Sequence, residues 1–107
     1  MATEQSELSV GAYQMFDEYS TDEAAATAKY SGKVVAVTGQ VRQSSTLEDG
    51  TPKVILETGK EFGVLCEFDP NTKHTRTTFQ PGEIVTIKGE CAGLNFDVQL
   101  SRCVVVK

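Results

Sequence analysis

The sequence predicts a single small domain that is mainly β, with helices at its N-terminal end. Two windows share one pattern, GKVVAVTG at 32–39 and GEIVTIKG at 82–89, and each alternates β-branched residues with the period of a strand. The chain after these helices contains five strand-like stretches separated by turn residues. Residues 9–31 instead have the apolar spacing and alanine content of helices. With 107 residues, the chain has the length of one domain.

We expect a helical cap over 9–31, preceded by a disordered stretch over 1–8. The first helix is expected to begin at Ser9 and to bury the apolar side chains that recur three residues apart, Val10, Tyr13, Phe16 and Tyr19. Ser20 or Thr21 is expected to cap the second helix, because Glu23 lies three residues after Ser20. Gly32 is expected to end that helix.

The barrel is expected to occupy 32–107, with strands over 33–44, 53–57, 62–68, 83–91 and 96–106. Val35, Val37, Val85 and Ile87 should face inward, and Gly39 and Gly89 should mark bends. Five strands with this spacing, and a long irregular connection after the third, match the Greek-key barrel of the OB-fold. The twin windows would then be strands one and four, which lie side by side.

The formal net charge is −5, and the acidic excess lies in the helical part. Residues 1–32 carry six acids and one base, whereas residues 33–107 carry nine of each. This balance argues against tight binding of nucleic acid through phosphates alone. No stretch is typical of a signal peptide or a transmembrane span, so the chain as given is expected to be soluble, with its location left open.

Three cysteines, Cys66, Cys91 and Cys103, lie in strand-like stretches without the spacing of a metal site. Buried free thiols are the first interpretation. A disulfide in an oxidising compartment is the alternative, and Cys66 with Cys103 is then the favoured pair.

We do not expect an enzyme, a cofactor or a metal site. The one histidine, His74, lies in a polar stretch without a cysteine or acid spaced to form a triad. The carboxylates are scattered, and the glycines are single and lie within strands rather than in a phosphate-binding loop.

Candidate ligand-binding residues follow from the habit of OB-folds to bind on strands two and three. Phe62 and Phe68 share the inward parity of Val64 and are expected in the core, so Phe96 is the better candidate for an exposed ring. Lys73 and Arg76 flank His74 in the one locally basic stretch. The full candidate set is Arg42, Lys53, Ile55, Leu65, Lys73, Arg76 and Phe96.

Four segments carry a resemblance to a known family. They are Y-x-x-D-E-A-A-x-x-A-x-Y-x-G-K-V-V-x-V-x-G-x-V at 19–41, FGVLCEF at 62–68, PGEIVTIKGECAG at 81–93 and V-x-L-x-x-C at 98–103. Together they resemble the bacterial tRNA-anti-like OB-fold family, with Asp22 in place of an expected asparagine.

The resemblance implies an OB-fold, with single-stranded DNA or RNA as the suggested ligand. It also implies an exported or lipid-anchored protein whose signal has been removed. A protein-interaction domain of the envelope, using the exposed apolar pair Ile55 and Leu65, is the alternative.

Overall fold

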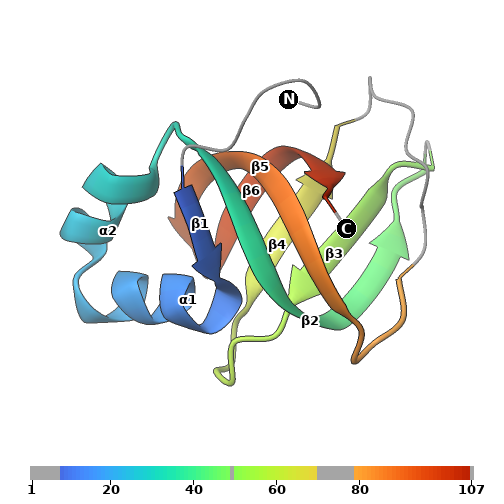
Figure 1. Cartoon of the computed structure of the whole chain (residues 1–107), viewed down its shortest axis with the longest axis horizontal. Helices are drawn as coiled ribbons and strands as arrows, with labels where there is room; N and C mark the ends of the chain where they lie inside the picture. The colour runs from blue at the N-terminus through green and yellow to red at the C-terminus, as the bar shows by residue number, and fades with distance from the viewer. Residues whose placement is uncertain (1–7, 49, 70–78, 107) are drawn as a thin grey trace.

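The computed structural model describes residues 8–48, 50–69 and 79–106 (Figure 1). The described residues form two helices and six strands, in the order β1 (Leu8–Gly11), α1 (Ala12–Thr21), α2 (Glu23–Tyr30), β2 (Val34–Thr46), β3 (Pro52–Leu56), β4 (Val64–Phe68), β5 (Ile84–Asn95) and β6 (Asp97–Val105). Of the stretch expected to be disordered, residues 1–7 lie outside the described part of the chain, and Leu8 already belongs to β1.

Strands β2 to β6 close into a five-stranded barrel, with both helices N-terminal to it, as the sequence predicted. The sheet order is β1-β2-β3-β4-β6-β5, and β2 also pairs with β5, which closes the barrel. Strands β4 and β6 are parallel, while the other barrel pairs are antiparallel. This arrangement is consistent with an OB-fold. In Figure 1 the long, curved β2 and β5 cross the front of the barrel and the helices lie together beside it.

The first helix begins at Ala12 rather than at Ser9, because Leu8–Gly11 forms a strand that was not predicted. This strand runs parallel to β2, with Leu8 opposite Val35 and Val10 opposite Val37. Parallel neighbours need a long crossover, which α1 and α2 supply here. The later start changes which side chains of α1 are buried: they are Ala12, Met15, Phe16 and Tyr19.

The second helix begins one residue after a carboxylate cap. Ser20 and Thr21 belong to α1, so the prediction that one of them caps α2 is wrong. The Asp22 carboxylate instead accepts a hydrogen bond from the Ala25 backbone N–H at 3.2 Å. Gly32 follows the end of the helix with φ of +78°, a left-handed conformation that glycine adopts without strain.

The twin windows pair with each other as β2 and β5. Val35 lies opposite Gly89 and Val37 opposite Ile87, and both valines and Ile87 are fully buried. On the outer face, the hydroxyl oxygens of Thr38 and Thr86 lie 2.8 Å apart and form a hydrogen bond. The period of two therefore predicted both faces correctly.

Two glycines in these strands have different roles. Gly89 lies where the β5–β6 register shifts, so the predicted irregularity is confirmed there. The irregularity of β2 lies between Val41 and Gln43, beyond Gly39. A Cβ atom at Gly39 would lie 2.8 Å from the Ala12 Cβ, so this glycine lets α1 approach the barrel.

All three cysteines are buried free thiols, as first expected. Burial raises the pKa of the Cys103 thiol, and a hydrogen bond with Cys66 acts in the same direction. Cys91 Sγ lies 3.3 Å from the Tyr19 hydroxyl oxygen. The Tyr19 ring stacks on the Tyr30 ring, with 6.0 Å between the ring centroids. The helical layer is thus joined to the barrel through a buried polar contact as well as through apolar packing.

Candidate ligand-binding surface

The outer face of β3 and β4 carries three of the predicted residues. Ile55 and Leu65 lie directly opposite each other, with Gln43 beyond Ile55 and Gln99 beyond Leu65. All four side chains are partly exposed or exposed. Lys53, two residues before Ile55 on the same face of β3, lies opposite Glu67. A mixed row of amide and apolar groups therefore crosses four neighbouring strands.

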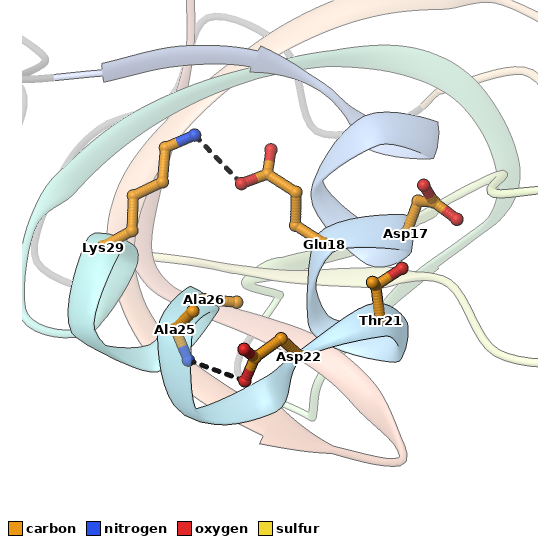
Figure 2. Close-up of a pocket in the computed structure, with 7 residues that line it drawn as sticks. All are labelled: Asp17, Glu18, Thr21, Asp22, Ala25, Ala26 and Lys29. Atoms are coloured by element: carbon orange, nitrogen blue, oxygen red, sulfur yellow. Dashed lines mark hydrogen bonds and ion pairs between the residues drawn. The ribbon is translucent and has the colours of Figure 1, made fainter.

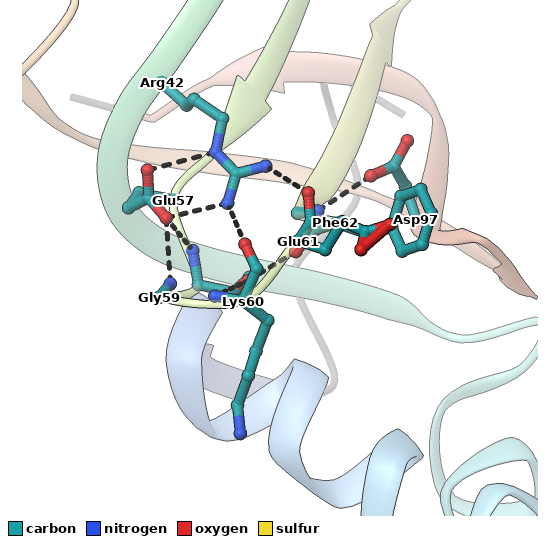
Figure 3. A network of polar contacts seen from close by, with 9 residues as sticks. Arg42, Glu57, Gly59, Lys60, Glu61, Phe62 and Asp97 are labelled. Carbon is teal, nitrogen blue, oxygen red and sulfur yellow. Dashed lines mark hydrogen bonds and ion pairs between the residues drawn. The ribbon is translucent and has the colours of Figure 1, made fainter.

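Arg42, the predicted residue on β2, is engaged in an internal network (Figure 3). Its Nε and Nη2 atoms donate to the two carboxylate oxygens of Glu57 at 3.0 and 2.7 Å. Nη2 also donates to the Lys60 carbonyl at 2.7 Å, and Nη1 donates to the Glu61 carbonyl at 3.1 Å. The forked geometry of the guanidinium suits both acceptor types at once. Arg42 thereby holds the β3–β4 loop, residues 57–63, against β2.

Glu57 completes the network from the loop itself. Its Oε2 accepts hydrogen bonds from the backbone N–H groups of Thr58 at 3.2 Å and Gly59 at 2.9 Å. The hydrogen bonds from Arg42, with the one from Gly59 next in importance, lower the pKa of Glu57 to about 2. Hydrogen bonding to Glu57 raises the pKa of Arg42. Burial acts to lower this pKa, but the charge of Glu57 and the nearby Asp97 and Tyr13 also act to raise it.

This lowered pKa predicts an acid dependence of stability. Between pH 4.5, the ordinary pKa of a glutamate, and about 2, the unfolded chain binds a proton at Glu57 that the folded chain does not. The stabilisation is therefore complete above pH 4.5 and is lost as the pH falls through 2. Urea unfolding across this range should give a shallower dependence on pH for Glu57→Gln than for the wild type. Identical slopes for the two proteins would contradict the assignment.

Two phenylalanine rings stand together at the loop end of this face. Phe96, in the β5–β6 turn, is 71% exposed, and its ring centroid lies 5.5 Å from that of Phe62, which is 36% exposed. The Asp97 carboxylate accepts the Gly63 N–H at 2.7 Å, which joins the turn to the loop (Figure 3). Phe96 is exposed as expected. The expectation of a buried Phe62 is wrong, because β4 begins only at Val64 and Phe62 belongs to the loop.

A third exposed ring lies on the other side of the same loop. Tyr13 of α1 is 57% exposed, although it was expected in the core. Its ring covers Gly59: a Cβ atom placed on that glycine would lie 2.9 Å from the Tyr13 Cε2. We call Tyr13, Phe62 and Phe96 the aromatic rim. Sequence reasoning missed Tyr13 and Phe62, and the late start of α1 and the late start of β4 explain the two errors.

Two further candidates come from the basic stretch of the sequence. Lys73 and Arg76, with His74, lie outside the described residues.

A hollow of about 350 Å³ lies between α1 and α2 and is lined by Asp17, Glu18, Thr21, Asp22, Ala25, Ala26 and Lys29 (Figure 2).

Most polar groups of this α1–α2 hollow are already paired. Glu18 accepts hydrogen bonds from Lys29 at 2.9 Å, Tyr30 at 2.8 Å and Gln14 at 3.2 Å. Burial acts to raise the pKa of Glu18, but these hydrogen bonds outweigh it and lower the pKa. Asp22 caps α2. The paired groups give the hollow a structural role in joining the helices.

The family becomes clear from a comparison of the whole chain. The model of the family described as tRNA_anti-like matches residues 1–105. This chain belongs to the tRNA_anti-like family. Five chains among solved structures are similar to this tRNA_anti-like protein, and no curated protein matches it.

One of these structures is a putative nucleic acid-binding lipoprotein from Klebsiella pneumoniae subsp. pneumoniae MGH 78578. It matches 99% of this chain and 94% of its own, with a TM-score of 0.61 at 19% identity. This likeness shows the shared fold. Among the described residues of the tRNA_anti-like chain, no helix is long and apolar enough to cross a membrane, and no cluster of three metal-ligating side chains occurs.

Proposed function

We propose that this tRNA_anti-like protein is a non-enzymatic binding module whose ligand is a single-stranded oligonucleotide. The observation that carries the proposal is the pair of exposed rings, Phe62 and Phe96, at the end of the β3–β4 face. Bases stack on exposed aromatic side chains whatever their sequence. Ile55 and Leu65 extend the apolar surface from these rings along the strands.

The rings are held in place before any ligand arrives. Arg42 fixes the carbonyls of Lys60 and Glu61, which precede Phe62 in the loop. The Gly63 carbonyl accepts the Val98 N–H at 3.0 Å and so fixes the other side. Rigid aromatic groups lose little conformational entropy on binding, which favours recognition.

Electrostatics favour modest affinity rather than tight binding. Arg42 is neutralised by Glu57, which leaves Lys53 and Lys60 as the other cations of β3 and the β3–β4 loop. With two phosphates neutralised on a single strand, the logarithm of the association constant should fall with log salt with a slope of about −1.4. A slope steeper than about −4 would require a different, more basic surface.

Replacing Phe96 with alanine is expected to weaken oligonucleotide binding about tenfold, because one stacked base loses its partner. The measurement is fluorescence anisotropy with labelled single strands of eight thymidines or eight uridines at 20 mM and 150 mM salt. Val106→Ala is the matched control, since Val106 is 53% exposed and lies next to Thr86 of β5 rather than on the aromatic rim. Absence of binding at tens of micromolar at low salt would overturn the proposal.

A second candidate function is protein binding in the bacterial envelope by an exported or lipid-anchored form. The directly paired Ile55 and Leu65, partly exposed on the outer face, favour it. Changing both residues to serine would separate the two functions. Capture of envelope proteins should then be lost, whereas oligonucleotide binding should weaken less than it does with Phe96→Ala, because both rings are kept.

A further inference from the structure

A second hollow lies between α1 and the β3–β4 loop. It measures about 400 Å³ and is lined by Tyr13, Gln14, Asp17, Thr58 and Lys60. It shares its loop with Phe62, so it continues the aromatic rim from the barrel onto the helical cap. Helix α1, which supplies part of its lining, is a different element from the strands and the turn that carry Ile55, Leu65 and Phe96.

The side chains of this hollow differ in what they can still bind. The Thr58 hydroxyl donates to the Phe62 carbonyl and accepts from the Lys60 N–H, so it is committed to the loop. The Gln14 amide donates to Glu18 at 3.2 Å. Asp17 has no hydrogen bond or ion pair within the described part of the chain. Figure 3 shows the Lys60 side chain extending toward α1.

An aromatic face beside an unpaired carboxylate favours one nucleobase above the others. A carboxylate only accepts hydrogen bonds and has two oxygens side by side. Guanine offers two adjacent donors on one edge, N1–H and the N2 amino group. Adenine and cytosine place an acceptor beside their amino group, which a carboxylate repels, and thymine or uracil offers a single N–H between two carbonyls.

We propose that this hollow is a guanine subsite, in which the base stacks on Tyr13 and donates N1–H and N2–H to Asp17. Lys60 reaches the adjacent phosphate and offsets the charge of Asp17. A bare phosphate is a poor occupant, because the unpaired Asp17 carboxylate lines the hollow and repels a second anion. The inference rests on the proposed oligonucleotide binding and adds a base preference to it.

The test compares labelled eight-residue strands of thymidine with strands in which one internal base is guanine, hypoxanthine or adenine. The guanine strand should bind about five- to tenfold more tightly than the all-thymidine strand, because the two charge-assisted hydrogen bonds add to stacking. Hypoxanthine, which lacks the N2 amino group, should lose most of that gain, and adenine should lose all of it. Asp17→Asn should remove the guanine preference and leave binding of the all-thymidine strand within about twofold.

Glu23→Gln is the matched control, because Glu23 is an exposed acid at the start of α2 and its change removes the same charge. It should leave the guanine preference intact. Equal effects of the two substitutions, or equal binding of all four strands, would overturn the guanine subsite while the proposed function stands. Failure of every strand to bind would overturn both. Thermal unfolding of each variant confirms that it is folded.

Discussion

Replacing Gly89 with alanine is expected to lower the free energy of unfolding by about 3 kcal/mol, since the barrel has no room for the added methyl group. The new Cβ would clash with the Cys103 Sγ and lie 3.0 Å from the Ser101 carbonyl oxygen and 3.3 Å from the Leu100 Cβ. All three atoms belong to β6, the strand that pairs with β5 beside Gly89. Urea unfolding of the wild type and the variant measures the difference.

A double-mutant cycle separates the thiol from the backbone in this effect. Cys103→Ala removes the sulfur that clashes most closely, but it leaves the Ser101 oxygen in place. We therefore expect Gly89→Ala to cost about 1 kcal/mol less in the Cys103→Ala background than in the wild type. Equal costs in the two backgrounds would contradict the placement of the thiol against Gly89.

The barrel was predictable because the alternation of apolar and polar residues along each strand indicates which side chains face the core. Ile55 and Leu65 were placed outward by alternation, and Val54 and Cys66, one position before and after them, are fully buried. This alternation depends only on which face of a strand meets the core, so it can be recognised without knowing which strands pair with one another. The pairing of the twin windows followed from the order of strands in a closed barrel of this kind.

The helical cap was predicted only in outline, because β1 left no local signal. Its four residues are too few to show alternation, and its partner β2 lies beyond both helices. Phe16 and Tyr19 are buried as predicted. Including Val10 in the helix, however, placed Tyr13 in the expected buried stripe, whereas the true helix buries Ala12 and Met15. Because of this error, Tyr13 was not predicted as an exposed ring of the aromatic rim.

The role of Arg42 could not be predicted from the sequence, because its partners are 15 to 19 residues away and meet it only through the fold. The sequence suggested Arg42 as a ligand-binding residue. In the structure it donates four hydrogen bonds to Glu57, Lys60 and Glu61. A guanidinium so engaged acts on a ligand through the loop that it positions.

Replacing Arg42 with alanine is expected to lower the free energy of unfolding by about 2 kcal/mol, because two loop carbonyls and the Glu57 carboxylate lose a charged donor. Backbone amides of residues 58–63 should exchange with solvent faster, and oligonucleotide binding should weaken because the loop that carries Phe62 is no longer held. Arg42→Lys keeps the charge but cannot form the fork, so it should lose part of the stability.

Arg102→Ala provides the matched control for the loss of an arginine–glutamate pair. Arg102 pairs with Glu90 at the surface, and its side chain is 52% exposed, against 26% for Arg42. Exposed pairs contribute little, so this variant should lose less than about 1 kcal/mol and bind oligonucleotides as the wild type does. If both alanine variants lose the same stability and leave amide exchange in the loop unchanged, Arg42 is an ordinary surface charge. If only Arg42→Ala frees the loop and weakens binding, the aromatic rim depends on being held in place.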